Sequence, residues 1–453
     1  MSPETVVDVL HGGGDVGQGE LVAAGIGVAP GVAGGVVAMS VESALDHFEA
    51  GHDLVLVLDE TRPADEVAMR VASAVVTRRG GPASHTAVLA RDLGLPAVVG
   101  CGEVRAAEGD QVWVDGRTGE VRRPGARATG MDAPVDELPD ALATLLGWAD
   151  ELAGVEVWAN ADTEASAVRA VAFGARGVGL CRMEHLLRGG EASLLDEALA
   201  ASGMGPAPDL DALVGAWTAA LAGVFRAMSG RPVTVRLLAR GHVHGDGVGA
   251  GSAGASLAVR RPDLLDAQAT AVRAAVEEAS DTGTGVRPRI LVPLVALPAE
   301  VEWIAGRLAE LAPGIPVGAM VETPRAALAA DRIAGHAGFL AFGTNDLTEL
   351  TYGWSRDASD AGLIDAYRRA GLLEVSPFET LDLGGVVRLL ALAVETARAA
   401  RPDIGLSLCG EHAGDPRSIA VAAQLGIGVV STSPWRVPVA RLAAAHAVLE
   451  GVG

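Results

Sequence analysis

The chain has 453 residues, of which 49% are hydrophobic and only 3% aromatic, and its formal net charge at pH 7 is −22. All 35 basic residues are arginine, so the sequence contains no lysine. This excludes pyridoxal-phosphate enzymes, Schiff-base aldolases and Walker A nucleotide loops, and the acidic balance disfavours general binding to nucleic acid or anionic membranes.

The N-terminal part of the chain predicts a small α/β domain. Residues 1–19 are polar and glycine-rich, which is typical of a flexible tail. Leu21 to Met39 is uncharged and nearly long enough to span a membrane, but its glycines and Pro30 favour β-structure. Residues 20–121 then predict a domain of about a hundred residues. Its clearest expected elements are strands at Leu54–Leu58, Ala74–Thr77, Ala97–Val99 and Gln111–Val114, with a helix at His85–Leu93.

Residues 122–153 predict a linker, Arg122–Met131, followed by a connecting helix at Leu138–Ala153. From residue 154 to residue 453, short apolar runs alternate with longer helical patterns. Eight such βα units predict a (β/α)8 TIM barrel, with an open doubly wound sheet as the alternative. The eight runs are Val155–Ala159, Gly177–Leu180, Val233–Leu238, Ile290–Val295, Val317–Val321, Phe339–Phe342, Leu406–Leu408 and Val429–Ser431.

Polar residues recur just past the ends of the expected barrel strands, where TIM-barrel enzymes carry their chemistry. They share this phase in seven of the eight units, which scattered surface residues would not do. They are Asn160, Arg182, Glu184, Arg236, Glu322, Arg325, Asn345, Asp346, Cys409, Glu411, His412, Ser433 and Arg436.

Gly80–Ala87 (GGPASHTA) follows a predicted buried strand, and His85 opens the next predicted helix. A helix N-terminus offers free N–H groups and a positive dipole end, which favour an anion. His85 is therefore a candidate carrier of a phosphoryl group. The alternative is a structural histidine in a βα turn.

Glu322 and Asp346 follow consecutive predicted strands in an otherwise apolar context. Two carboxylates with substrate oxygens suit Mg²⁺, although each could instead be a solvated loop acid. Arg236 lies inside a predicted buried strand, where an unpaired charge is costly. Arg182 and Arg236 are thus candidates to bind carboxylate or phosphate.

Cys409 ends a predicted strand at the expected barrel mouth, so its thiol is a candidate nucleophile or proton donor. The alternative for Cys409 is a small buried filler. Cys101 and Cys181 are assigned to packing. Three widely spaced cysteines make neither a disulfide framework nor a zinc pattern, so we expect a reducing, cytoplasmic compartment.

These motifs together resemble those of the phosphoenolpyruvate-utilising enzymes, a family that includes pyruvate phosphate dikinase, phosphoenolpyruvate synthase and enzyme I of the sugar phosphotransferase system. GGPASHTAVLAR followed by LGLPAVVG resembles the phosphohistidine motif of their swivelling domain, which implies a β/β/α fold for this part of the chain. GVGLCRMEH, PVTVRLL, VETPRAAL, FGTNDLT and SLCGEHAGDP resemble their phosphoenolpyruvate-binding barrel. The resemblance runs from about residue 20 to the end, and it is closest to the central and C-terminal domains of pyruvate phosphate dikinase.

The resemblance implies a role for each matched position. His85 would take the phosphoryl group and Cys409 would protonate the pyruvate enolate. Mg²⁺ would be held by Glu322 and Asp346. Substrate would be bound by Arg182, Arg236 and Asn345. It also implies a homodimer, and the His85 domain would swivel on its linker to reach the barrel.

Several positions depart from the family pattern. The aspartate after R-L-L is Ala239, and the arginines of an R-G-x-R motif are Ala253 and Ser256. Threonines are replaced by Met183 in R-x-E-H and by Ala83 two residues before the histidine. Losing the arginine at position 253 could remove about 2–4 kcal/mol of transition-state stabilisation.

Three functions remain open at this stage. The first is a phosphotransferase half-reaction between phosphoenolpyruvate and His85, in either direction, with the ATP step on a separate ATP-grasp protein because no such domain precedes residue 20. The second is a non-catalytic regulatory paralogue that binds phosphoenolpyruvate or pyruvate. The third is a carbon–carbon lyase or mutase acting on pyruvate-like enolates, which the His85 domain disfavours.

Overall fold

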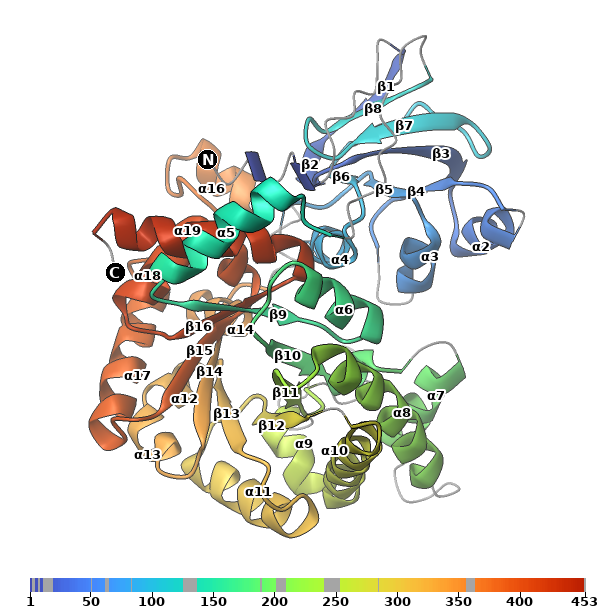
Figure 1. The fold of residues 1–453 in the computed structure, drawn as a ribbon. Coiled ribbons are helices and arrows are strands. Elements are labelled where there is room, and N and C mark those ends of the chain that lie inside the picture. The colour runs from blue at the N-terminus through green and yellow to red at the C-terminus, as the bar shows by residue number, and fades with distance from the viewer. Residues whose placement is uncertain are drawn as a thin grey trace. The chain divides into compact units, whose positions relative to one another are not determined.

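The computed structural model describes residues 1, 5–6, 9–10, 19–49, 51–61, 65–82, 84–124, 137–187, 190–200, 209–239, 253–283, 285–355 and 363–451. Most of the predicted tail and the linker from residue 125 onward lie outside these residues. The chain divides into two compact units (Figure 1). One consists of Met1–Ala143 with Gly353–Thr380, and the other of Thr144–Tyr352 with Leu381–Gly453.

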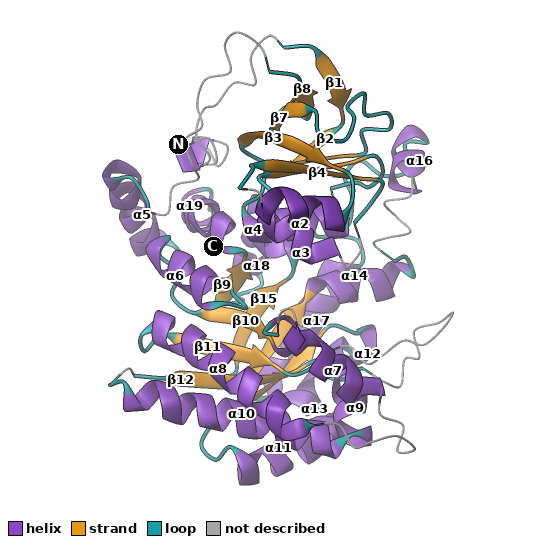
Figure 2. Cartoon of the chain, turned by 90° about the vertical axis from the view of Figure 1, so that its right-hand side faces the viewer, coloured by secondary structure: helices purple, strands orange, loops and turns teal. Residues whose placement is uncertain are grey.

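The first unit is built on an eight-stranded sheet in the order β1-β8-β7-β3-β4-β5-β6-β2. Helices α2, α3 and α4 lie on one side of this sheet (Figure 2). Its strands are β1 (Leu21–Ala24), β2 (Ile26–Ala29), β3 (Val32–Ala38), β4 (Leu54–Leu58), β5 (Ala74–Thr77), β6 (Ala97–Val99), β7 (Gln111–Asp115) and β8 (Glu120–Arg122). Its helices are α2 (Val41–Glu49), α3 (Glu66–Val71), α4 (His85–Leu93) and α16 (Ile364–Arg369).

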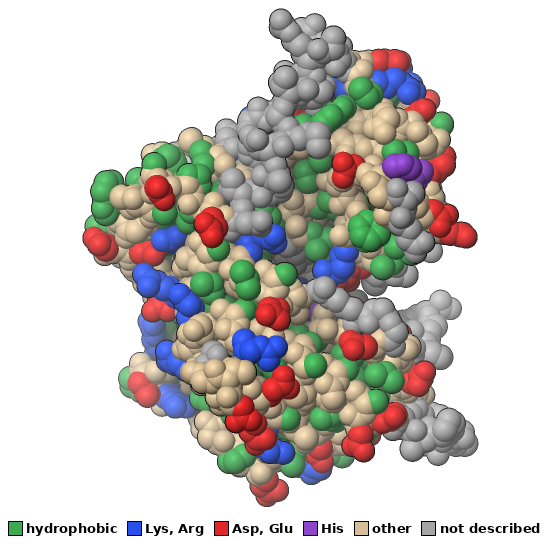
Figure 3. Space-filling model, turned by 45° about the vertical axis from the view of Figure 1, so that its right-hand side comes forward, with side chains coloured by type: hydrophobic (Ala, Val, Ile, Leu, Met, Phe, Trp, Pro, Cys, Tyr) green, Lys and Arg blue, Asp and Glu red, His purple; other side chains and the backbone are tan. Residues whose placement is uncertain are grey.

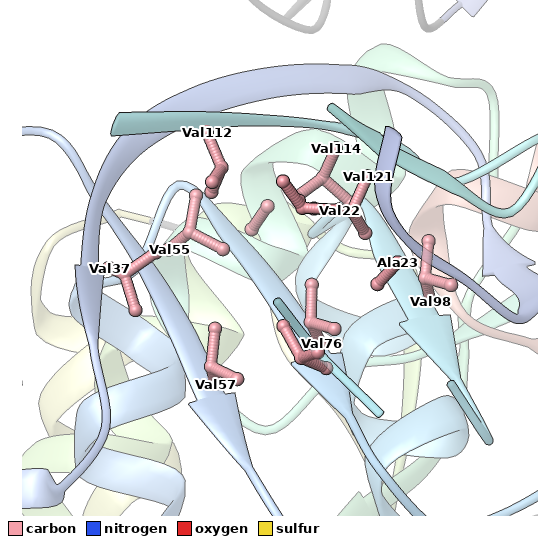
Figure 4. Packing of buried hydrophobic residues seen from close by; sticks show 12 residues of the cluster. Val22, Ala23, Val37, Val55, Val57, Val76, Val98, Val112, Val114 and Val121 are labelled. Atoms are coloured by element: carbon pink, nitrogen blue, oxygen red, sulfur yellow. The ribbon is translucent and has the colours of Figure 1, made fainter. Parts of the chain in front are cut away.

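Two apolar clusters cover the two faces of the central strands. On the helical face, Leu54, Leu56 and Val75 pack with Met69 of α3 and Ala90 of α4. On the other face, the valines of β4, β5 and β6 meet those of β1, β7 and β8 (Figure 4). Alternate residues of one strand therefore belong to opposite clusters, because successive side chains of a β-strand point to opposite faces. This is the predicted β/β/α arrangement, and the stretch read as glycine-rich β-structure forms β1 to β3.

The second unit contains a closed barrel of eight parallel strands. These are β9 (Glu156–Asn160), β10 (Val178–Arg182), β11 (Pro232–Arg236), β12 (Arg287–Val292), β13 (Val317–Val321), β14 (Phe339–Gly343), β15 (Gly405–Cys409) and β16 (Val429–Thr432). The predicted TIM barrel is confirmed. The open sheet is wrong, because β16 pairs with β9 and closes the ring.

Helices surround the barrel strands (Figure 1). Along the chain they are α5 (Asp140–Leu152), α6 (Glu164–Ala172), η2 (Met183–His185), α7 (Gly190–Ala200), α8 (Leu210–Met228), α9 (Gly254–Arg260), α10 (Pro262–Asp281), α11 (Pro298–Leu311), α12 (Pro324–Ala327), α13 (Ala330–Ala334), α14 (Thr344–Tyr352), α17 (Val386–Ala400), η4 (Glu411–Gly414), α18 (Pro416–Gln424), η5 (Pro434–Arg436) and α19 (Val437–Leu449). Over the visible barrel helices, arginines are interspersed with acidic side chains (Figure 3).

Most strand limits lie within one or two residues of the prediction, and the fourth strand differs most. The third strand was expected to reach Leu238 but ends at Arg236. Leu237 and Leu238 stay buried beyond it, and the Leu238 N–H donates to Gln268 Oε1 at 2.7 Å instead of to a strand. The fourth strand was expected at Ile290–Val295 but runs from Arg287 to Val292. Its Arg289 guanidinium lies 3.6 Å from the centroid of the Phe339 ring, a contact that lets a charged residue lie in this strand.

Helix α8 is long and apolar enough to cross a membrane by length and composition alone. In the structure it lies against α10 and α6 of the barrel unit. Its apolar residues Leu213, Trp217, Leu221 and Phe225 are buried there. Packing in the barrel therefore accounts for the apolar character of this helix.

A buried ion pair anchors the C-terminal helix of the barrel unit. Arg441 is 6% exposed, its Nε and Nη2 atoms lie 2.9 Å from the two oxygens of Asp150, and its Nη1 donates to Phe173 O at 2.9 Å. We predict that Arg441→Met lowers the free energy of unfolding by about 1–3 kcal/mol, because the partly buried Asp150 carboxylate then keeps only one bond, from the exposed Arg176 at 3.2 Å. Urea unfolding measures this loss.

Arg273→Met is the matched control, because Arg273 and Glu277 form an exposed pair on one helix. That variant should change the free energy of unfolding by less than about 0.5 kcal/mol. Equal losses in the two variants would contradict the prediction.

Candidate active site at the carboxyl end of the barrel

The structure gathers the predicted barrel residues at one end. Arg182, Arg236 and Cys409 are the last residues of β10, β11 and β15, and Asp346 lies in the first turn of α14. Glu322 follows β13 directly. Their charges act on one another: the pKa of Cys409 is raised to about 12, mainly by burial and also by Glu322 and Asp346, while Arg236 and Arg182 oppose the rise. These five residues therefore share one site.

Glu322 and Asp346 form the candidate metal site. Glu322 is 2% exposed. Burial raises the pKa of Glu322 well above its ordinary value, the Asp346 carboxylate raises it further, and Arg236 opposes both. Two acids pressed together in this way fit a divalent cation that takes oxygen ligands, such as Mg²⁺. The described residues contain no group of three or more His, Cys, Asp and Glu arranged for a metal, so substrate or water would complete the coordination.

The loop after β12 orients Glu322. The Leu294 N–H donates to Glu322 Oε1 at 2.6 Å. Leu294 has φ of 50°, a left-handed conformation that costs a non-glycine residue roughly 1–2 kcal/mol. The start of α9 braces this loop, since the Ala255 N–H donates to Pro293 O at 2.9 Å. Gly254 (φ 55°) has no room for a Cβ against Pro293 and Leu294.

Each candidate arginine forms an ion pair with a carboxylate, Arg182 with Asp162 and Arg236 with Glu184. Arg236 bonds to Glu184, and both side chains are nearly buried. Burial would raise the pKa of Glu184, but Arg236 and then His185 outweigh it and lower that pKa. Among the described residues, Glu184 Oε2 and Arg236 Nε have no hydrogen-bond partner. Buried polar atoms of this kind are normally satisfied by water or a ligand.

Asn345 and Cys409 are fixed by a small polar network. Asn345 Oδ1 accepts from the Glu411 N–H at 3.0 Å. The Thr344 hydroxyl donates to Cys409 O at 2.9 Å and lies 2.8 Å from Nδ1 of the buried His412. The Cys409 thiol donates to Phe342 O at 3.4 Å. With its raised pKa, this thiol keeps its proton near neutral pH, which suits a proton donor better than a nucleophile.

His85 lies in the other unit, as the first residue of α4. Ser84 caps this helix, and its hydroxyl accepts from the Ala87 N–H at 3.3 Å. Thr86, the residue after His85, shares a hydrogen bond of 2.8 Å between its hydroxyl and that of Thr61. Gly80 makes the turn before the helix with φ of 114°. The imidazole is half-buried at a helix N-terminus, the position expected from the sequence.

The two positions that depart from an R-G-x-R motif begin α9. Ser256 caps this helix locally: its hydroxyl donates to Ala253 O at 2.7 Å and accepts from the Ala253 N–H at 3.3 Å. Ala253 ends in a methyl group and cannot bind an anion through its side chain. Residues 240–252, including Arg240, lie outside the described residues, as does Ala83.

The sequence interpretation missed Asp162, Thr344 and Leu294 and gave Glu184 no role. Asp162 follows β9 by two residues and shares the carboxyl edge of the barrel, so the same phase argument could have included it. A bond from a main-chain N–H, as at Leu294, leaves no signal in the residue type.

A closed parallel barrel whose mouth carries paired arginines, two carboxylates and a protonated thiol is suited to anionic, oxygen-rich ligands. Residues 137–449 match the PEP-binding domain of the PEP-utilising enzymes, and residues 50–119 match the mobile domain of the same family. The chain therefore belongs to the PEP-utilising enzymes, as its motifs predicted.

Several curated relatives are pyruvate phosphate dikinases. The chain is 37% identical over 490 residues to pyruvate, phosphate dikinase 1, chloroplastic, of Arabidopsis thaliana, which covers 95% of this chain and 50% of the relative. It is 35% identical over 511 residues to the Rhizobium meliloti (strain 1021) enzyme, with 100% and 56% covered. For Clostridium symbiosum the values are 34% over 491 residues, 95% and 55%. The chain thus spans about half the length of these relatives.

Proposed function

We propose that the chain catalyses phosphoryl transfer between phosphoenolpyruvate and His85, giving phosphohistidine and pyruvate, or the reverse reaction. The observation that carries the proposal is the grouping of Arg182, Arg236, Glu322, Asp346 and Cys409 at one barrel mouth, each acting electrostatically on others. His85, at the N-terminus of α4 in the mobile domain, supplies the nucleophile.

In this reaction the chain's own groups have distinct tasks. Arg236 and Arg182 bind the phosphate and carboxylate of the substrate through charge-assisted hydrogen bonds, with Asn345 beside them. A ring nitrogen of His85 attacks phosphorus, so a nitrogen–phosphorus bond forms and the bond from phosphorus to the enol oxygen breaks. The Cys409 thiol gives its proton to the enolate carbon, which yields pyruvate.

Glu322 and Asp346 would hold Mg²⁺, and Leu294 would keep Glu322 in place through its N–H. When bound there, the metal would supply positive charge that stabilises the phosphate and enolate oxygens. The mobile domain would swivel on the Arg122–Met131 linker to bring His85 to the barrel. The ATP step would lie on a separate ATP-grasp protein, and the chain would act as a cytoplasmic homodimer.

A regulatory protein that binds phosphoenolpyruvate or pyruvate without turnover is the second candidate. Ala253 and Ser256 favour it, because Ser256 uses its hydroxyl to cap α9 and Ala253 offers only a methyl group. Such a protein would keep the metal and substrate contacts of the barrel and lose stabilisation of the transferring phosphate, worth about 2–4 kcal/mol.

Exchange of labelled pyruvate into phosphoenolpyruvate in the presence of Mg²⁺ separates the two. We predict measurable exchange by the unaltered protein and a fall to background in His85→Ala, because exchange requires the phosphorylated histidine. His52→Ala, an exposed histidine of the same unit, should exchange normally. Binding of phosphoenolpyruvate without any exchange would favour the regulatory protein.

A further inference from the structure

Asp162 occupies the loop after β9 and contacts two basic side chains at the barrel mouth. Its Oδ1 accepts from the Arg182 N–H at 2.7 Å, and its Oδ2 accepts from Arg182 Nε at 2.9 Å and also from Nη2. His185 Nδ1 lies 3.3 Å from the same Oδ2. The Asp162 side chain is 10% exposed and that of Arg182 is 19% exposed.

These contacts fix both ends of Arg182. The bond to the main-chain N–H holds the last residue of β10, and the two side-chain bonds hold the plane of the guanidinium. An arginine without such a partner would sample many rotamers and lose that freedom on binding a substrate. A two-bond carboxylate contact removes much of this entropy loss before the ligand arrives.

Arg182 lies close enough to the other site residues for its charge to act on them. Its charge acts on Arg236 and on the Cys409 thiol, so the guanidinium lies within electrostatic reach of both. The Glu184–Arg236 pair repeats the arrangement beside it. The barrel mouth thus has two acid–arginine pairs side by side.

We propose that Asp162 is a positioning residue that holds the Arg182 guanidinium in the orientation that binds the anionic end of the substrate. This inference deepens the proposed function and rests on it. It gives an acid that touches no substrate a defined effect on substrate affinity.

A purely structural role for Asp162 is the competing explanation, and Asp150 provides its control. Asp150 accepts from the same two donor atoms of an arginine, Arg441 Nε to Oδ1 and Nη2 to Oδ2 at 2.9 Å each, and also from the exposed Arg176 at 3.2 Å. The Asp150 and Arg441 side chains are 19% and 8% exposed. The pair joins α5 to α19, and Arg441 also donates to Phe173 O at the end of α6. None of these partners is among the candidate site residues of the barrel mouth. Asp150→Asn should therefore lower stability and leave substrate binding unchanged.

The test compares Asp162→Asn, Asp162→Glu and Asp150→Asn by calorimetric binding of phosphoenolpyruvate with Mg²⁺, by KM and kcat of pyruvate exchange, and by thermal unfolding. Asp162→Asn should weaken binding and raise KM by roughly 10- to 100-fold, with a smaller change in kcat. Asp162→Glu should restore part of the affinity. Asp150→Asn should bind normally even if it unfolds at lower temperature.

Normal affinity in Asp162→Asn, or an equal loss of affinity in Asp150→Asn, would overturn the proposal. If the proposed function is wrong, the unaltered protein would bind phosphoenolpyruvate or pyruvate but exchange no label. In that case the measured affinities alone would test the role of Asp162. If the unaltered protein binds neither compound, Arg182 has no substrate to bind and this inference falls with the proposed function.

Discussion

Replacing Asp346 by asparagine should make the metal-free barrel more stable and abolish its response to Mg²⁺. Burial raises the pKa of Glu322, and repulsion by the Asp346 carboxylate raises it further. Removing one charge should add about 1 kcal/mol or more to the unfolding free energy, or roughly 2–4 °C in midpoint for a barrel of this size. Saturating Mg²⁺ should stabilise the unaltered protein by about 2.7 kcal/mol at a hundred times its Kd, but not the variant.

Thermal unfolding with and without Mg²⁺ measures both effects, and pyruvate exchange should fall at least about 100-fold in Asp346→Asn. Glu349→Gln, one turn further along the same helix, is the control and should keep the Mg²⁺ response. A variant that is less stable without metal, or that still gains stability from Mg²⁺, would show that these carboxylates do not form the metal site.

Replacing Arg236 by methionine should have the largest effect on stability and binding together. The substitution leaves the nearly buried Glu184 carboxylate without its guanidinium partner, on which its lowered pKa depends. Breaking such a pair from one side costs about 3–5 kcal/mol. It also removes a positive charge that lowers the pKa of Glu322 and so counteracts burial and the Asp346 carboxylate. Urea unfolding should record the first effect, and phosphoenolpyruvate binding should be lost.

The double variant Arg236→Met with Glu184→Leu separates stability from binding. Two apolar side chains can replace a buried ion pair at little cost, so the double variant should recover most of the unfolding free energy. It should not recover phosphoenolpyruvate binding, because no guanidinium remains at that place. Recovery of both would mean that Arg236 serves only to neutralise Glu184.

The barrel could be predicted from the sequence because its strands are short apolar runs separated by long helical patterns. Polar residues at the same phase then marked the carboxyl end, and Arg182, Arg236 and Cys409 do end their strands. The apolar pattern alone misplaced several strand limits. Leu237 and Leu238 are buried outside the strand, and Arg289 is accommodated inside the barrel by aromatic rings.

The partners of the site residues could not be predicted in the same way. Which acid pairs with which arginine depends on strand register, which places Arg182 opposite Arg236. In this register Arg182 pairs with Asp162, and Arg236 pairs with Glu184. The orientation of Glu322 depends on a main-chain N–H and on the positive φ of Leu294. The substitution to Ser256 was recognised in the sequence, but its capping of α9 is visible only in the structure.

The most direct test of the central claim is the intact mass of the protein after incubation with phosphoenolpyruvate and Mg²⁺. The account predicts one acid-labile phosphoryl group on His85 and one pyruvate released for each group added, and neither in His85→Ala. An unmodified protein that binds phosphoenolpyruvate would contradict transfer, and a modification that persists in His85→Ala would contradict the assigned site.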